Sequence, residues 1–407
     1  MAASRTKHLS SVDLLRSWTV VGVLAVHTIS NTTTGSDRSA GALLELLHVT
    51  RSVFLALSGF VLAYSLAARP LATWAFWRRR YPLVLAPYLV WTALYLLNDY
   101  DPSHYGSAGK MLWRYVVDLA DGGARYHLYF LLLTLQLYLI MPWLYRWLER
   151  QRRHHLALLA AAAVFQLAFT AAIHYGWRPP VLSVWLNHPG SWLPSYPLYV
   201  IGGVLAAMHF EEVTDWVTSH RRLIAWSVLG AAALGVLSYA SDLTWLSMGP
   251  IKASQVFQPS VVIESVAFTA GLYALGIAVA GRLRARGRRR AESSADVSFG
   301  VYLAHPMLLQ GLIAASAATG LSGALSGLPS GVILPMVLGL LVPTLCLASW
   351  GGVAVIRRTP LSVWLTGRPR QVSPPPDDPL LPGPPRLLGT APARGALPLG
   401  SPLRVKE

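Results

Sequence analysis

The stretch VDLLRSWTVVGVLAVHTIS, residues 12–30, is almost entirely apolar, yet it carries an acid, a guanidinium and an imidazole, namely Asp13, Arg16 and His27. Its length approaches the roughly 20 apolar residues that a helix needs to cross a bilayer. Ionisable side chains inside such a segment usually face a cavity or a pathway, because a charge facing lipid is costly. The stretch therefore predicts a membrane-spanning helix with one polar face.

The composition of the whole chain agrees with a membrane location. Of its 407 residues, 54% are hydrophobic and only 13% are charged, and the mean hydropathy is +0.44. Soluble domains carry about 25% charged residues. The single cysteine, Cys346, excludes a disulfide framework and a cysteine metal site. We expect an all-α integral membrane protein that crosses the cell membrane several times.

Ten segments approach the length of a membrane span. They cover residues 12–30, 42–67, 82–98, 126–146, 156–176, 195–210, 223–240, 257–280, 296–317 and 331–356. The sixth is short and is expected to be tilted or partly broken. The tenth contains Pro335 and Pro343, which are expected to kink its helix.

Basic residues gather in alternate loops. One set of loops holds Arg5, Lys7, Arg78, Arg79, Arg80, Arg150, Arg152, Arg153, Arg221, Arg222, the arginines of 282–290, Arg357 and Arg358. The other set holds only Arg38, Lys110, Arg114, Arg125, Arg178 and Lys252. Because cytoplasmic loops are enriched in Lys and Arg, both termini are predicted to be cytoplasmic. The same asymmetry explains the net charge of +16 without a nucleic-acid partner.

The sequence divides into three regions. Residues 1–11 are predicted to form a cytoplasmic N-terminus, 12–358 a ten-helix membrane domain, and 359–407 a cytoplasmic tail. The tail is rich in proline, as in PPPDDPLLPGPPRLL at 374–388, and proline at this density blocks helix and sheet. We expect the tail to be disordered.

The polar residues of the first helix share one face. Arg16 and His27 are eleven positions apart, which at 100° per residue brings them within about 20° of each other and about 16 Å apart along the axis. Asp13 and Arg16 are neighbours at i and i+3. The predicted direction of this helix places Asp13 and Arg16 near the cytoplasmic surface and His27 in the outer half.

The second segment repeats this pattern. Glu45, His48 and Arg51 follow one another at intervals of three and are expected within about 60° on one helix, at the depth of His27. Ser58 and Gly59, further along, are small residues that favour close helix contact.

Later spans add single polar groups, which are His127, Gln136, Glu264 and His305. A buried carboxylate needs a partner or a proton, so Glu264 is expected to meet Arg51 or a histidine. These residues include no HExxH motif and no histidine pair at helical spacing, so we predict no metal site. The absence of a GxSxG elbow and of a P-loop removes the serine-hydrolase and ATPase interpretations.

Together these residues resemble the membrane-bound acyltransferase 3 family. Arg16, ten intervening residues and His27 look like its R-X10-H signature. HVTRSVFLALSGFVLAY (48–64), RRRYPLVLAPYLVW (78–91), HLYFLLLTLQLYLIMPWL (127–144) and SFGVYLAHPMLL (298–309) are similar to four later segments of that family, in the same order. The likeness covers residues 8 to about 358. The chain departs from the pattern at Leu83, where the family often has another arginine.

The resemblance implies transfer of an acyl group, often acetyl from acetyl-CoA, to a hydroxyl that commonly belongs to a carbohydrate. His27 is the candidate general base, or nucleophile if an acyl-histidine forms. Arg51 and Glu264 are the other candidate catalytic residues. Arg16, Arg78, Arg79 and Arg80 are expected to bind the phosphates of cytoplasmic acyl-CoA. Asp13, His48, Ser58, His127 and His305 are expected to support the site.

Two other classes of function remain open at this point. A transporter or flippase of glycan intermediates would also place ionisable groups inside the membrane. A scaffold with the enzyme fold but no activity is disfavoured by the intact Arg16, His27 and Arg51. The acceptor could be a polysaccharide, peptidoglycan, a glycolipid or a secreted metabolite, and neither the acyl chain nor the oligomeric state follows from the sequence.

Overall fold

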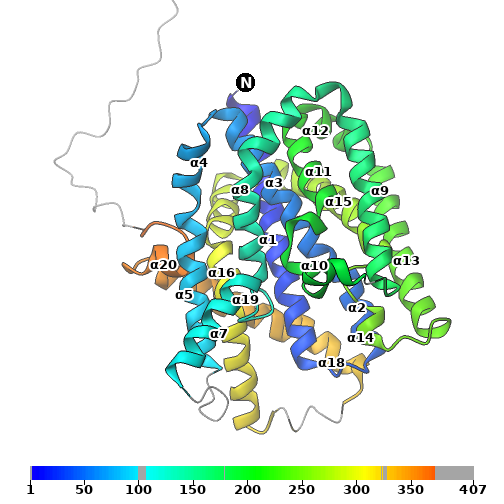
Figure 1. Ribbon diagram of the computed structural model, residues 1–407, viewed down its shortest axis with the longest axis vertical. Coiled ribbons are helices and arrows are strands. Elements are labelled where there is room, and N and C mark those ends of the chain that lie inside the picture. Colours follow the sequence, from blue (N-terminus) through cyan, green and yellow to red (C-terminus); the bar gives the residue numbers. More distant parts are fainter. Residues whose placement is uncertain (1, 100–106, 178, 322, 324–327, 372–407) are drawn as a thin grey trace, which may run out of the picture. The chain divides into compact units, whose positions relative to one another are not determined.

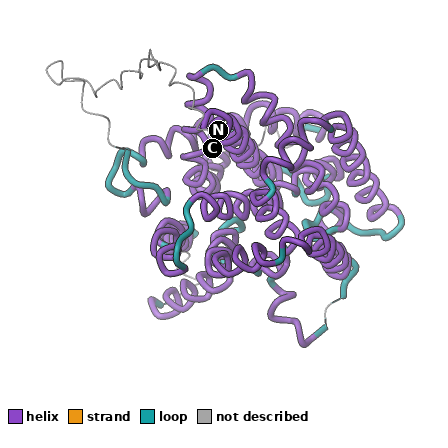
Figure 2. The backbone as a smooth tube through the Cα atoms, turned by 90° about the horizontal axis from the view of Figure 1, so that it is seen from above, coloured by secondary structure: helices purple, strands orange, loops and turns teal. Residues whose placement is uncertain are grey.

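The computed structural model describes residues 2–99, 107–177, 179–321, 323 and 328–371. All the regular elements among these residues are helices, as Figure 2 shows, and none is a strand. The first half comprises α1 (Ala2–Thr32), α2 (Arg38–Leu47), α3 (Val49–Ala68), α4 (Thr73–Arg80), α5 (Pro82–Asn98), α7 (Ala108–Asp121), α8 (Tyr129–Arg150) and α9 (His155–His174). The second half comprises α10 (Ser183–Asn187), α11 (Pro197–Met208), α12 (Phe210–Ser219), α13 (Arg221–Thr244), α14 (Pro250–Ala253), α15 (Pro259–Arg282), α16 (Ala285–Ala318), α18 (Ser330–Met336), α19 (Val342–Ile356) and α20 (Ser362–Thr366).

The predicted all-α, multi-pass architecture is confirmed. Within the described ranges, 9 helical stretches are long and apolar enough to cross a membrane. They are Ser10–Thr32, Arg38–Ala68, Thr73–Asn98, Tyr129–Arg150, Arg152–His174, Arg221–Thr244, Pro259–Arg282, Ala285–Ala318 and Gly331–Ile356. The sixth predicted span is α11, whose 12 residues extend only about 18 Å. It is too short to cross a hydrocarbon core of about 30 Å by itself.

Three of the long stretches are interrupted, each at an identifiable place. α2 ends and α3 begins on either side of His48. α5 begins at Pro82, whose ring suits the first turn of a helix. Between Pro335 and Pro343 the chain forms a π-helical stretch, Val337–Leu341, as expected for a helix disturbed by prolines.

α1 is the central helix. It packs against α3, α15 and α16, and Figure 1 shows it running through the middle of the other helices. Val20, Leu24 and Ile29 on α1 are fully buried. Because α1 is continuous from Ala2 to Thr32, Arg16 and His27 belong to one helix, and their separation is set by its rise.

α3 and α11 pack closely because small residues lie between them. A Cβ added at Gly59 would lie 3.0 Å from the carbonyl oxygen of Val200, and one at Gly203 would collide with the carbonyl of Ala56. Ser58 donates a hydrogen bond at 2.8 Å to the Phe54 carbonyl of its own helix. These contacts agree with the packing expected of Ser58 and Gly59.

The prediction that the disordered tail begins at residue 359 is wrong. Residues 359–370 belong to the compact unit, and within them α20 packs against α5 and α16. The proline-rich part of the tail, 372–407, lies outside the described residues. The sequence reasoning also missed α7 and α12, which lie between the spans and show one apolar and one polar face.

The first prediction concerns which end of the bundle is cytoplasmic. Figure 1 places α2, α7 and α14 at one end and α4 at the other. In a chain with Cys346 replaced by Ser, single cysteines at Arg38, Lys110 or Lys252 should react with an impermeant maleimide added to whole cells. Cysteines at Arg79 or Arg152 should react only after the cells are opened, because basic loops remain inside. Labelling of Arg79→Cys on whole cells would contradict the predicted orientation.

Candidate active site

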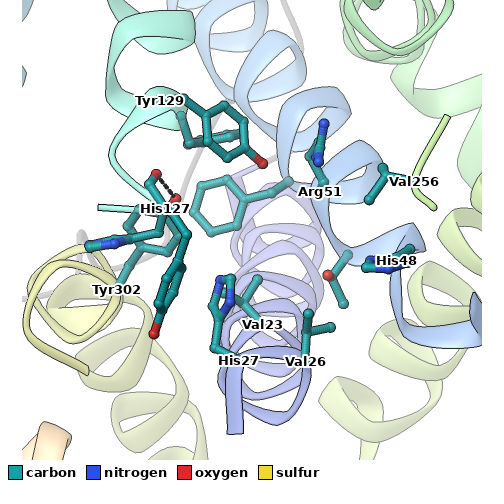
Figure 3. Close-up of a pocket in the computed structure, with 13 residues that line it drawn as sticks. Val23, Val26, His27, His48, Arg51, His127, Tyr129, Val256 and Tyr302 are labelled. Carbon is teal, nitrogen blue, oxygen red and sulfur yellow. Dashed lines mark hydrogen bonds between the residues drawn. The ribbon is translucent and has the colours of Figure 1, made fainter. Parts of the chain in front are cut away.

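A cavity of about 100 Å³ lies beside the C-terminal third of α1. Figure 3 shows side chains from several helices surrounding it. Its lining consists of Val23, Val26, His27, His48, Thr50, Arg51, Phe54, Tyr126, His127, Tyr129, Phe130, Val256 and Tyr302. Three histidines, one arginine and three tyrosines thus meet inside an apolar bundle, and such concentrations of ionisable groups mark functional sites.

His27 is half-buried and packs against two other rings. Its centroid lies 4.4 Å from that of Tyr126 and 5.3 Å from that of His305. The His27 imidazole therefore has one side against protein and another against the cavity. This arrangement leaves a ring nitrogen accessible to a molecule in the cavity.

The orientation of His305 follows from the proline next to it. Pro306 has no N–H, so the carbonyl of Tyr302, four residues earlier, lacks its usual helical donor. Nδ1 of His305 lies 2.7 Å from that oxygen and replaces the missing donor. Because a carbonyl only accepts, Nδ1 carries the hydrogen, and Nε2 of the neutral ring keeps its lone pair.

His127 is held beside this pair. The hydroxyl of Tyr302 donates a 2.5 Å hydrogen bond to the His127 carbonyl, the dashed line of Figure 3. The His127 ring lies 5.3 Å from that of His305. Burial, reinforced by His305 and His27, lowers the pKa of His127 well below its usual value. His127 is therefore neutral near pH 7.

Arg51 faces the cavity without a carboxylate partner. Nη1 donates a 2.5 Å hydrogen bond to the hydroxyl of Tyr196. Its Cζ lies 5.0 Å from the ring centroid of Tyr129 and 5.4 Å from that of Phe257, close enough for cation–π attraction. In the part of the chain that the structure describes, no acid forms an ion pair with Arg51. Its charge remains available to an anion that develops in the cavity.

The structure separates the predicted site residues into groups. His27, His48, Arg51 and His127 line the cavity, and His305 packs directly behind His27. Ser58 and Glu264 do not line it.

The expected contact of Glu264 with Arg51 or a histidine is wrong. Glu264 is fully buried on α15, and neither carboxylate oxygen has a hydrogen-bond partner among the described residues. Its carboxylate lies against Gly235 on α13, where a Cβ would collide with it. The position of Glu264 along its span indicated the depth of this residue in the membrane. It did not indicate the side of α15 from which the carboxylate projects.

Glu45 also points away from the cavity, because the helix breaks at His48. Its two carboxylate oxygens accept 2.8 Å hydrogen bonds from Gln258 and Ser260. This contact ties α2 to the start of α15 and to the segment that carries Val256 and Phe257.

A second polar group lies around Arg16, near the midpoint of α1 and about 16 Å from His27. Arg16 is half-buried there, with Asp13 near it. Arg80 turns inward and donates a 3.0 Å hydrogen bond to Ser65, and Tyr138 on α8 lies within electrostatic range of Arg80 and Arg16. Arg78 and Arg79 are exposed. Arg80, unlike its two exposed neighbours, thus lies near Tyr138, a residue that Arg16 also approaches.

Sequence reasoning missed the tyrosines of the cavity. Tyr126, Tyr129 and Tyr302 line it, and Tyr196 holds Arg51. The chain has 17 tyrosines, and aromatic residues are common in membrane helices, so their identity alone gave no signal. Only their proximity to His127 and His305 in the sequence pointed to the site.

The fold and the cavity define a multi-pass membrane protein with a buried histidine–arginine site. Residues 9–348 match the family described as an acyltransferase domain, and the chain belongs to this acyltransferase 3 family. The resemblance drawn from the R-X10-H pattern is thereby confirmed, and the protein is a membrane acyltransferase. No curated protein and no solved structure matches the chain.

The second prediction separates His27 from His305. His27→Ala should lower acyl transfer by about 10²–10⁴-fold, the usual contribution of a general base, and should leave the melting temperature in detergent nearly unchanged. His305→Ala should retain part of the activity but be less stable by about 1–3 kcal/mol, because the Tyr302 carbonyl loses its donor.

The exposed His154 supplies the control, since His154→Ala should change neither quantity. Substantial activity in His27→Ala would reject the catalytic role of His27 and favour a transport function.

Proposed function

We propose that the protein moves an acyl group, in the first instance acetyl, from cytoplasmic acyl-CoA to a hydroxyl of a carbohydrate, a glycolipid or a secreted metabolite. The observation that carries this proposal is the arrangement of α1. Arg16, near the midpoint of this helix, has other guanidinium groups in its neighbourhood, and His27, close to the C-terminal end of the helix, presents an imidazole to a cavity. The region of Arg16 would bind an anionic donor, and His27 would take part in proton transfer.

The donor would bind with its phosphates near Arg16 and Arg80. Guanidinium forks match phosphate geometry and remain charged at all relevant pH values. The pantetheine arm of coenzyme A is extended, and its length is comparable to the distance of about 16 Å that separates Arg16 from His27. The phosphates would thus stay close to the aqueous surface while the thioester reaches the cavity.

His27 would act as the general base. The acceptor oxygen attacks the thioester carbon as His27 removes the hydroxyl proton, and a tetrahedral oxyanion forms. Collapse of this intermediate breaks the carbon–sulfur bond and releases the thiolate, which takes the proton back from His27. If His27 instead attacks the thioester itself, coenzyme A leaves as its thiol with the ring proton and an acyl-imidazole forms. The hydroxyl then takes the acyl group, and its proton returns to the imidazole.

Arg51 would stabilise the oxyanion. Its positive charge has aromatic faces and one tyrosine hydroxyl around it rather than a carboxylate, so it is not neutralised before the reaction. A fixed donor in a water-poor site contributes more to the transition state than the same donor in water.

The acceptor would enter at the end opposite Arg16. Tyr126 lines the cavity and is also 37% exposed, and burial raises the pKa of its phenol to about 12, so it keeps its proton. Beside it Arg125 donates to Asp99 at 2.6 Å, and Asn98 donates to Gln310 at 2.9 Å. Amides, a phenol and a neutralised ion pair suit a hydroxyl-rich acceptor.

The third prediction tests the proposed function directly. Cells with and without the gene are compared by mass spectrometry of surface glycans and exported metabolites. Loss of one acyl mass from a defined compound is expected, and the wild-type gene should restore it while His27→Ala should not. Identical acylation in the two strains, together with retention of an unacylated glycan intermediate inside the cell, would favour the transporter.

The fourth prediction distinguishes the three adjacent arginines. Arg80→Ala should raise the KM for the donor about tenfold and change kcat by less than about twofold, because a phosphate contact remote from the reacting carbon stabilises ground and transition states alike. Arg78→Ala and Arg79→Ala are matched controls and should behave as wild type, since both side chains are exposed. Equal effects of all three substitutions would show that the charge of the loop, rather than Arg80, binds the donor.

A further inference from the structure

The segment after the last membrane-spanning helix folds back onto the bundle. Its helix α20 packs against α5 and α16, as Figure 1 shows. Nε1 of Trp91 on α5 donates a 3.0 Å hydrogen bond to the carbonyl of Leu365. This segment lies beyond residue 348, where the match to the acyltransferase family ends.

Two further contacts fix the backbone at Arg368. The hydroxyl of Ser362 donates a 2.8 Å hydrogen bond to the Arg368 carbonyl. Gly367 has a φ of 62°, and a Cβ there would lie 2.8 Å from the ring of Phe299 and collide with the Leu83 carbonyl. Only glycine fits a left-handed position with so little space. The chain thus holds Arg368 in one place.

Arg368 shares a carboxylate with a second arginine. Nη1 of Arg357 lies 2.6 Å from Asp296, and the side chain of Arg357 is 6% exposed. Nε of Arg368 lies 3.4 Å from the other oxygen of Asp296, and its side chain is 37% exposed. The shorter and more buried contact neutralises most of the carboxylate. Arg368 therefore keeps positive charge for another partner.

That charge lies near Arg16 on α1, against which α16 and its Asp296 pack. Of the charged groups near Arg16, Arg368 acts on it most strongly, ahead of Asp13. Tyr138 lies within electrostatic range of Arg80, Arg16 and Arg368 together. Asp13 and Asp296 each act on Arg16 more weakly than Arg368 does, so an anion bound beside Arg16 and Arg368 would relieve the repulsion between the two guanidinium groups. No acid among the described residues forms an ion pair with Arg16.

We propose that Arg368 binds a phosphate of the acyl-CoA donor together with Arg16 and Arg80. This inference rests on the proposed function, because it takes the donor from there. It adds a donor-binding residue from a segment outside the family match. The phosphate of an anionic lipid headgroup has the same chemistry, and the experiment has to separate the two sources.

The fifth prediction is measured by titration calorimetry of coenzyme A against the full chain in phosphatidylcholine nanodiscs. R368A should weaken binding about tenfold, as expected for the loss of one charge-assisted hydrogen bond, and R368K should fall between R368A and wild type. R370A removes the same charge from an exposed arginine two residues away and should bind as wild type. The dissociation constant does not depend on how much of the variant is folded, so a partial loss of stability leaves the comparison intact.

Three outcomes would overturn the assignment. Unchanged affinity in R368A would exclude a contact with the donor, and equal losses in R368A and R370A would indicate only a general effect of charge. A lipid source would give a different pattern. R368A would bind coenzyme A normally in phosphatidylcholine, and phosphatidylglycerol would compete with coenzyme A on the wild-type chain but not on R368A. A wild-type chain that binds no coenzyme A would instead refute the proposed donor itself.

Discussion

The continuity of α1 is the constraint on which the rest of the site depends. It runs without a break from Ala2 to Thr32, and it is enclosed by α3, α15 and α16. The rise of this one helix sets the distance between Arg16 and His27, so neither residue can move without the other. Guanidinium groups gather near Arg16, and imidazole and phenol groups gather near His27.

The chemistry at His27 depends on where the charged groups of the cavity point rather than on how many there are. Arg51 is surrounded by aromatic rings and a hydroxyl, and the acids that the sequence places at its depth are turned elsewhere, Glu45 towards Gln258 and Glu264 towards Gly235. An acid beside Arg51 would neutralise it and would compete with a developing oxyanion. The structure therefore keeps cation and carboxylates apart inside one membrane domain.

Periodicity predicted the parts of the site that lie within single helices. The common face of Arg16 and His27 follows from their spacing alone, and Pro306 explains why His305 bonds the Tyr302 carbonyl. Contacts between helices were beyond this reasoning, because spacing gives depth but not the rotation of one helix against another, which is why Glu264 was misplaced. The position of Arg368 depends on the contact of its segment with Trp91, which is distant in sequence, and on the tight packing of Gly367. The proline-rich composition of the tail gave no sign of these contacts.

The central claim is that donor and acceptor meet at His27 from opposite ends of the bundle, and its most direct test is the sidedness of the reaction. Oriented proteoliposomes receive acetyl-CoA on one side only, and the release of free coenzyme A is followed together with the position of the acylated product. The account predicts that acetyl-CoA is consumed only from the side of Arg16 and Arg80, and that the acyl group appears on the opposite side. Consumption from the side of Tyr126 and Arg125, or product on the side of the donor, would contradict it.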